Sequence, residues 1–258
     1  MLVFAVLSDL PAVTLVAIFL IAILAGIVKG AIGFAMPLVM ISGIGSLIDP
    51  KLALAGIILP ILMSNGLQTF RKGVGEAARA AREFWRYLAM VCVAIFLAAQ
   101  AVPFIPGQTF YLVLGIPVLA LAAVQLAGLR LTIPVPWRPL AEWVAGILSG
   151  ILGGLSGTWG PTTVLYLLAI DTPKSRQIVI QGVIYGLGSV TLLFAHIQSG
   201  ILNAQTAPFS VALLPSALLG MWIGFQIQDR LDQELFRKIT LIVLMIGALN
   251  LVRRGLIG

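Results

Sequence analysis

Charged residues are scarce in this chain of 258 residues. Asp, Glu, Lys and Arg make up only 10% of it, against about a quarter of a soluble protein. Long intervals contain none of them, including 52–70, 87–129, 143–170 and 177–228. Each of these can hold one or more spans of about 20 apolar residues. The sequence therefore indicates an integral membrane protein, and its continuous apolar runs favour helices over the alternating strands of a barrel.

Reactive side chains are scarce as well. With one cysteine, Cys92, and one histidine, His196, the chain offers no disulfide framework and no metal-ligand cluster. The acidic residues all fall at or near predicted loops, and no phosphate-binding G-x-x-x-x-G-K-[ST] motif occurs. The sequence therefore predicts a protein that is not an enzyme and carries no cofactor. We expect His196, near the outer end of its segment, to be a surface or helix-capping residue.

Apolar segments of helical length follow one another along the whole chain. They predict an all-α fold, a polytopic membrane protein with about 8–10 transmembrane or re-entrant helices. The stretch 76–86 is predicted to be a short amphipathic helix on the membrane surface. The predicted segments are 11–28, 32–48, 52–70, 87–104, 110–128, 140–153, 158–170, 178–197, 207–226 and 239–252.

The basic residues predict the orientation of the chain, because cytoplasmic loops carry an excess of Lys and Arg. The loop RKGVGEAARAAREFWR at 71–86 is the richest in these residues. Counting crossings onward places the following on the same, cytoplasmic side: Arg130, Arg138, Lys174, Arg176, Arg230, Arg237 and Lys238. Lys51, Arg253 and Arg254 fall on the other side and count against this topology. The net charge of +7 thus reflects topology and predicts no nucleic-acid partner.

A glycine-rich motif occurs twice. GIVKGAIGFAMP at 26–37 and GILGGLSGTWGP at 150–161 share the pattern G-x-x-x-G-x-x-G-x-x-x-P. Each is followed by a motif typical of a capped helix start, Asp49-Pro50-Lys51 and Asp171-Thr172-Pro173-Lys174. The pattern predicts two repeats, 1–128 and 129–258. Because each has an odd number of segments, the second is expected to be inverted, as in many secondary transporters. Whether the first two segments of each repeat cross fully or form a re-entrant hairpin stays open.

These two motifs resemble those of the TauE/SafE family, also called the sulfite exporter family. The resemblance extends over about 10–252 and is strongest in GGLSGTWGPTTVLYLLAIDTPKSRQ at 153–177. It implies a multi-pass permease of the bacterial inner membrane that exports small sulfur-containing anions such as sulfite or organosulfonates. Where many members carry glycines, this chain has Phe34-Ala35-Met36 and Thr158-Trp159-Gly160. These departures border the expected site and therefore bear on which anion is bound.

Lys29 is the only charged residue between Asp9 and Asp49. A lysine at mid-membrane costs roughly 2.5–3.5 kcal/mol on insertion scales, so it is a candidate for pairing with the anion. The alternative is a lysine at a helix end that reaches the headgroups.

The other candidate anion-binding residues are neutral. Backbone amides at glycine breaks can bind an anion, although such glycines also allow close helix packing. Hydroxyl and amide side chains can add neutral donors, or join helices by hydrogen bonds. The candidates are Gly30, Gly33, Phe34, Asn65, Gln68, Gly154, Ser156, Gly157, Thr158, Trp159, Gln181 and Tyr185.

The function predicted is secondary transport of a small anion across a lipid bilayer by alternating access between the repeats. The alternatives are a permease for another small anion, a carboxylate or an inorganic oxyanion, and an anion channel. A coupling ion, proton or sodium, and assembly as a homo-oligomer both stay open.

Overall fold

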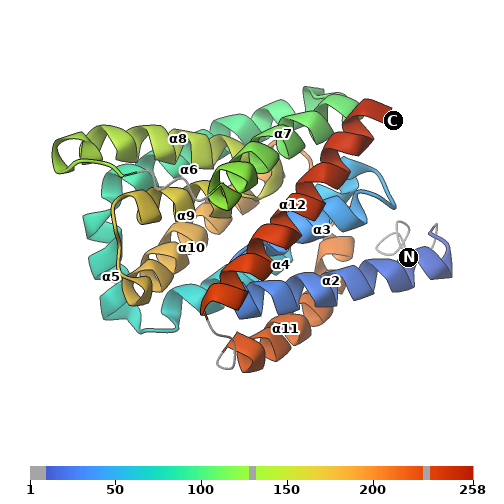
Figure 1. Ribbon diagram of the computed structural model, residues 1–258. Coiled ribbons are helices and arrows are strands. Elements are labelled where there is room, and N and C mark those ends of the chain that lie inside the picture. Colours follow the sequence, from blue (N-terminus) through green and yellow to red (C-terminus); the bar gives the residue numbers. More distant parts are fainter. Residues whose placement is uncertain (1–9, 128–131, 229–232, 258) are drawn as a thin grey trace.

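The computed structural model describes residues 10–127, 132–228 and 233–257 (Figure 1). All the regular elements in these residues are helices, so the predicted all-α class is confirmed. The helices are α2 (Ala12–Ile32), α3 (Met36–Ile44), α4 (Pro50–Phe70), α5 (Val74–Glu83), α6 (Trp85–Ala101), α7 (Gly107–Leu126), α8 (Arg138–Ser156), α9 (Gly160–Ala169), α10 (Lys174–Gln198), α11 (Ala207–Gln228) and α12 (Gln233–Ile257). Short 3₁₀ turns lie at Val102–Phe104 and Val135–Trp137.

The protein crosses the membrane several times. In the described residues, 6 helices are long and apolar enough to span a bilayer: those at 12–31, 50–70, 85–104, 135–156, 176–198 and 207–227. Their outward faces are apolar, as lipid contact requires. On α2, for example, Val16, Leu20 and Leu24 are each more than half exposed and lie about one turn apart.

The first two helices of each predicted repeat are unequal in length. α3 has 9 residues and α9 has 10, so each rises about 14–15 Å, half the thickness of a hydrocarbon core. Neither can span the membrane alone. After a sharp turn, α3 follows α2 and α9 follows α8. Each short helix packs against the longer helix that precedes it.

The predicted helix starts are confirmed in one case and wrong in the other. The Asp49 carboxylate accepts hydrogen bonds from the amides of Lys51 (2.9 Å) and Leu52 (3.0 Å), and α4 begins at Pro50. In the second motif Pro173 precedes α10, and no side chain caps it. Asp171 instead adopts a φ of 54°, because the chain turns there after α9.

Glycines on α2 and α8 allow two helix pairs to approach closely. α2 packs against α11, and α8 packs against α6. A Cβ on Gly30 would lie 2.2 Å from the Met221 carbonyl oxygen, and one on Gly154 would lie 2.4 Å from that of Ile95. Both glycines are inside helices. The expectation that they interrupt the helices is therefore wrong, and their role in the structure is close helix packing.

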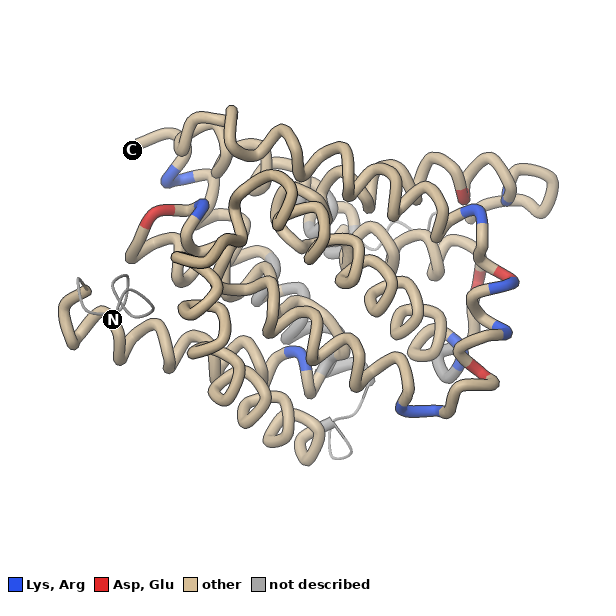
Figure 2. Tube along the Cα trace, turned by 180° about the vertical axis from the view of Figure 1, so that it is seen from behind, with Lys and Arg blue, Asp and Glu red and all other residues tan. Residues whose placement is uncertain are grey.

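The two ends of the bundle carry most of the charge (Figure 2). At one end α5 lies beside the start of α10, where Arg176 pairs with Glu83, and Arg86 lies 3.6 Å from Glu142. These belong to the loops predicted to be cytoplasmic; Arg130 and Arg230 of that set lie outside the described residues. At the opposite end, Arg254 donates to the carbonyl oxygens of Gly45 (2.9 Å) and Ser46, just after α3. These hydrogen bonds give a structural reason for a basic residue at the end of the bundle that is predicted to lie outside the cytoplasm.

Candidate functional site

The two glycine-rich motifs face each other inside the bundle. Residues of both, with side chains from α4 and α10, line one small cavity of about 20 Å³, which is room for about one water molecule. Of the predicted site residues, the cavity brings together Lys29, Phe34, Asn65, Gly157, Thr158, Trp159 and Tyr185. Four further residues of the lining were not among the predicted candidates, although all belong to the repeated motifs: Ala35, Pro37, Gly160 and Pro161.

Lys29 is buried beside this cavity with neutral partners. Its side chain, in the last turn of α2, is 3% exposed, so it does not reach the membrane surface. Its Nζ donates to Asn65 Oδ1 at 2.5 Å and lies 5.7 Å from the centre of the Tyr185 ring. Asn65 Nδ2 in turn donates to the Tyr185 carbonyl oxygen at 3.2 Å. Among the described residues, no carboxylate pairs with Lys29. The site therefore has one basic side chain and, among the described residues, no acidic partner for it.

The helix breaks are built on positive φ angles. Gly33 (φ 83°) and Gly157 (φ 69°) end α2 and α8 in the left-handed region, where glycine is favoured. Their amides donate to the carbonyl oxygens of Lys29 (2.7 Å) and Gly153 (2.6 Å). The expectation that glycine amides face an anion therefore does not fit, because these donors are already used.

Backbone amides without a partner in their own helix lie just after the breaks, at the starts of the two short helices α3 and α9. The first amides of α3 and α9 have no partner within their own helices, and no side chain caps either helix. Ala35, which precedes α3, has a φ of 69°, which is unfavourable for a residue with a Cβ. Its conformation could not be read from the sequence, because alanine does not favour it.

The predicted hydroxyl donors differ in position. Thr158 lines the cavity, and its hydroxyl donates to the Ser156 carbonyl oxygen at 3.3 Å. Ser156 is buried inside α8, where its hydroxyl donates to the Leu152 carbonyl oxygen at 2.8 Å. Ser156 therefore stabilises its own helix end and lies outside the lining.

Gln68 and Gln181 lie next to the break at Gly33. Both are 7% exposed, and a Cβ built on Gly33 would lie 3.8 Å from Gln68 Nε2 and from Gln181 Oε1. Gln68 Oε1 has no hydrogen-bond partner. Because this oxygen can only accept a hydrogen bond, it can pair with a donor such as water but not with an anion.

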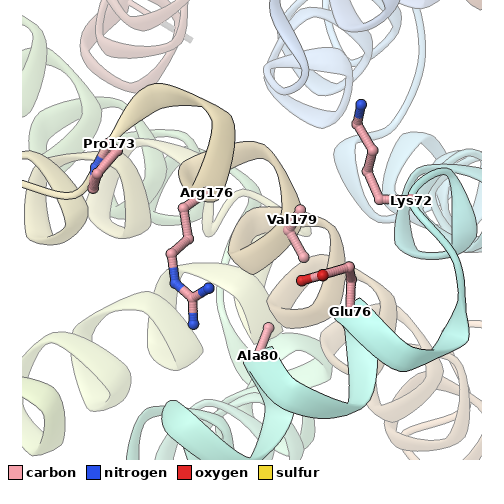
Figure 3. Close-up of a pocket in the computed structure, with 6 residues that line it drawn as sticks. All are labelled: Lys72, Glu76, Ala80, Pro173, Arg176 and Val179. Carbon is pink, nitrogen blue, oxygen red and sulfur yellow. The ribbon is translucent and has the colours of Figure 1, made fainter.

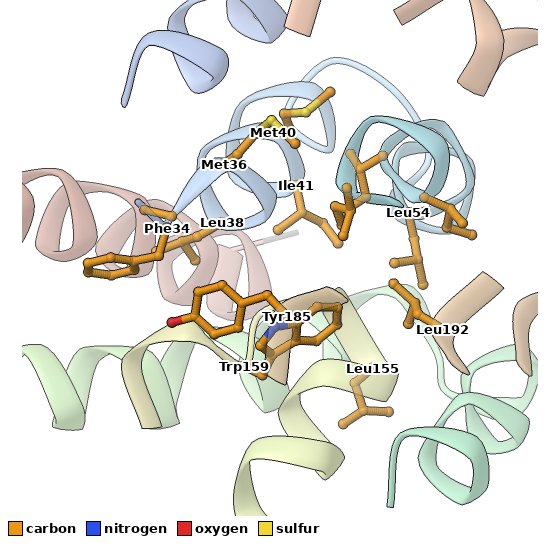
Figure 4. Packing of buried hydrophobic residues seen from close by; sticks show 14 of the residues in the cluster. Phe34, Met36, Leu38, Met40, Ile41, Leu54, Leu155, Trp159, Tyr185 and Leu192 are labelled. Atoms are coloured by element: carbon orange, nitrogen blue, oxygen red, sulfur yellow. The ribbon is translucent and has the colours of Figure 1, made fainter. Parts of the chain in front are cut away.

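Aromatic side chains close the cavity. The rings of Trp159 and Tyr185 are 6.3 Å apart at 54°, and Figure 4 shows Phe34 beside them. The Tyr185 hydroxyl donates to the Gly160 carbonyl oxygen at 3.4 Å. A Cβ on Gly160 would lie 3.0 Å from the Phe34 ring, so this ring packs directly on the second break. The surface that lines the cavity is mostly apolar.

The expectation of a surface position for His196 is wrong. Its side chain is 0% exposed. Residues after α10 fold back over the helix end, where the Leu202 amide donates to the His196 carbonyl oxygen at 2.9 Å. His196 does lie at a helix end, as predicted. It belongs to the last turn of α10, and its Nδ1 lies 3.2 Å from Ser199 Oγ.

A second, open pocket lies at the predicted cytoplasmic end (Figure 3). It has a volume of about 420 Å³ and lies between α5 and the start of α10, with Lys72, Glu76 and Arg176 among its lining residues. Because its charges are mixed and it is separate from Lys29, it is a surface feature of this end of the bundle and no part of the central site.

A multi-pass helical bundle whose interrupted helices meet at a buried polar centre has the architecture of a membrane transporter. A sequence model of the family described as "Sulfite exporter TauE/SafE" matches residues 18–251. The chain belongs to this family, as its motifs predicted, and is a membrane transporter. Comparison with curated proteins and with solved structures gave no match.

Proposed function

We propose that this protein carries small sulfur-containing anions, such as sulfite or organosulfonates, out of the bacterial cytoplasm across the inner membrane. The observation that carries the proposal is Lys29, a buried cation that is held by Asn65 and Tyr185 and has no carboxylate partner in the described part of the chain. A structural lysine at this depth would be expected to have a counter-charge, because an unpaired buried charge is costly. An anion would supply that charge during transport.

The neutral groups around Lys29 suit a sulfur oxyanion. At about 4 Å and an effective dielectric constant of about 20, one charge pair is worth about 4 kcal/mol. The remaining oxygens would accept hydrogen bonds from the second amide proton of Asn65, from the first amides of α3 and α9, and from Thr158 once its hydroxyl turns away from the Ser156 carbonyl oxygen. The apolar rings of Phe34 and Trp159 would exclude water or contact the organic part of a sulfonate.

Alternating access is supported by the size of the cavity and by the pairing of the helices. A space of about 20 Å³ is too small for an oxyanion, so its walls must separate to load the site. We propose that 1–128 and 129–258 are inverted repeats that move against each other. In Figure 1, α2 and α4 run opposite to α8 and α10, and the pair α2–α11 corresponds to the pair α8–α6 when the repeats are exchanged.

The experiment is anion flux in liposomes that contain the purified protein. The panel is sulfite, sulfate, thiosulfate, sulfoacetate and a carboxylate of similar size. We expect saturable flux of a sulfur anion in the wild type, and a loss of about tenfold or more in Lys29→Met, since tenfold corresponds to only 1.4 kcal/mol of lost charge pairing.

Arg253→Met is the matched control, because it removes one positive charge from an exposed position outside the cavity, next to Arg254, which binds the Gly45 carbonyl oxygen. It should transport like the wild type. Equal rates in Lys29→Met, with normal yield and folding, would exclude the proposed role of Lys29. Faster flux of the carboxylate than of any sulfur anion would replace the proposed substrate class.

A further inference from the structure

A row of buried hydroxyl groups lies between α6, α8 and α9. The Tyr87 hydroxyl is 2.5 Å from Ser149 Oγ and 3.0 Å from Thr163 Oγ1. Ser149 Oγ donates to Thr162 Oγ1 at 2.5 Å, and the hydroxyls of Thr162 and Thr163 each donate to the Trp159 carbonyl oxygen at 2.9 Å. Trp159 lines the central cavity, so the row ends at a carbonyl oxygen of the residue beside the proposed anion site.

The other end of the row meets polar atoms that lack partners. The Tyr166 ring stacks on Tyr87, with ring centres 5.3 Å apart. The Tyr166 hydroxyl, Glu142 Oε2 and Arg138 Nε are all buried, and none makes a hydrogen bond, although Glu142 Oε2 has an ion-pair partner in Arg86 at 3.6 Å. Tyr166 lies within electrostatic reach of both Glu142 and Arg138. Unpaired buried polar atoms require an explanation, and three of them beside a hydroxyl row point to a mobile hydrogen-bonding species.

Glu142 is the acidic residue of this group. Of the six candidate spans, only the one at 135–156 contains an acidic residue. The groups that face Glu142 are Arg86 from α6, 3.6 Å away, Tyr166 from α9, Glu83 from α5 and, one turn earlier on α8, Arg138. Its side chain is 12% exposed at the predicted cytoplasmic end. Glu142 can therefore exchange protons with cytoplasmic water at one side and face Tyr166 at the other.

We propose that the row of Tyr87, Ser149 and Thr162 carries protons between the cytoplasm and Lys29, so that the anion and a proton are exported together. Water would bridge the row to Tyr166 and Glu142 at one end and to Lys29 at the other, where no direct hydrogen bond joins them. The inference rests on the proposed function. The proton passes from water to the Glu142 carboxylate and then along the row. Each hydroxyl oxygen accepts one proton and releases its own, and the last proton binds the neutral Lys29 amine. Only O–H and N–H bonds form and break.

This coupling follows from the charge of the site. The loaded carrier holds an ammonium and an anion, so the pair is neutral. After the anion leaves, a protonated Lys29 would be a buried charge without a counter-charge, since its partners Asn65 and Tyr185 are neutral. The empty carrier would therefore return with neutral lysine, and the row would restore the proton on the cytoplasmic side. The alternative is that the hydroxyls only join helices by hydrogen bonds.

Two rates distinguish a proton path from hydroxyls that only join helices: the exchange of labelled sulfite and its net efflux. Leak through protein-free liposomes is subtracted from both rates. Exchange swaps one bound anion for another while Lys29 stays protonated, so it needs no proton from the row. Net efflux requires the empty carrier to return and therefore requires the row. We expect Tyr87→Phe and Glu142→Gln to keep exchange and to lose net efflux by about tenfold or more, a ratio that corresponds to 1.4 kcal/mol.

Tyr111→Phe is the control, because the Tyr111 hydroxyl donates to the Gly45 carbonyl oxygen at the opposite end of the bundle. Both of its rates should match the wild type. Ser149→Ala interrupts the row at its centre and replaces Tyr87→Phe if that variant does not fold. Wild-type net efflux in the row variants would overturn the inference and leave the proposed function standing. A wild-type protein that exchanges no sulfur anion would overturn the proposed function and the inference with it.

Discussion

At the residue scale, Asn65 links the cation of the site to the opposite helix. It accepts a hydrogen bond from Lys29 and donates one to the Tyr185 carbonyl oxygen. Because its amide is neutral, Asn65 fixes the position of the ammonium without cancelling its charge. The same geometry with a carboxylate would give Lys29 a permanent partner, and the anion would have to compete with it.

Asn65→Asp is therefore predicted to reduce transport more than its small change in shape suggests. The new carboxylate pairs with Lys29, and we expect the initial rate of sulfite flux to fall by about tenfold or more, for a competing charge interaction of at least 1.4 kcal/mol. Gln100→Glu is the comparison, since Gln100 lies on α6, outside the cavity lining, and donates to Ala195 at 3.2 Å. Flux in Asn65→Asp at the wild-type rate would show that the charge of Lys29 does not bind the anion.

Most residues of this site could be predicted from the sequence. Which of their groups are free to donate hydrogen bonds could not. Lys29 and Asn65 could be recognised because a charge and an amide are exceptional in apolar helices. The roles of Gly30 and Gly154 could not, because a glycine that breaks a helix and one that allows helix packing look alike in sequence. Ser156 and His196 were misjudged because helix ends and returning loops decide which side chains are covered.

At the element scale, the two closest helix pairs depend on residues without side chains. Along α8, Gly146, Gly150 and Gly154 all face backbone atoms of α6 at distances that a Cβ cannot tolerate. Along α2, Gly26 and Gly30 face α11 in the same way. These contacts hold the two long helices that carry the breaks, so they position the site from outside it.

Gly154→Ala is predicted to lower the melting temperature. The added Cβ would meet the Ile95 carbonyl oxygen at 2.4 Å, so α6 and α8 must separate, and such overpacking costs about 1–3 kcal/mol. Gly66→Ala, inside α4, is the control, because a Cβ there meets nothing within 4 Å. That change should be neutral or stabilising by about 1 kcal/mol through helix propensity. Thermal unfolding in detergent measures both, and equal melting temperatures would contradict the packing role of Gly154.

The helices themselves were largely predictable. Apolar runs bounded by charges or prolines gave segments that correspond to α2–α4 and α6–α12, and the amphipathic stretch at 76–86 corresponds to α5. The ends were less accurate where no charge or proline marks them. The segment expected at 11–28 continues to Ile32, since the helix ends only where Gly33 adopts a positive φ.

At the scale of the whole molecule, the proposed anion site is lined by both halves of the chain. Lys29 and Asn65 belong to the first half, whereas Thr158, Trp159 and Tyr185 belong to the second. An anion bound between them would contact both, and would stabilise the folded protein because the unfolded chain has no such site. The extent of that stabilisation reports binding directly, without assumptions about direction or driving force.

The most direct measurement is therefore the effect of sulfite on thermal unfolding of the wild type, Lys29→Met and Arg253→Met. At about 100 times the dissociation constant, a bound ligand adds about 2.7 kcal/mol to the free energy of unfolding. We predict a saturable rise in melting temperature for the wild type and Arg253→Met, and none for Lys29→Met. The same rise in a folded Lys29→Met protein would contradict the claim that this buried lysine binds the transported anion.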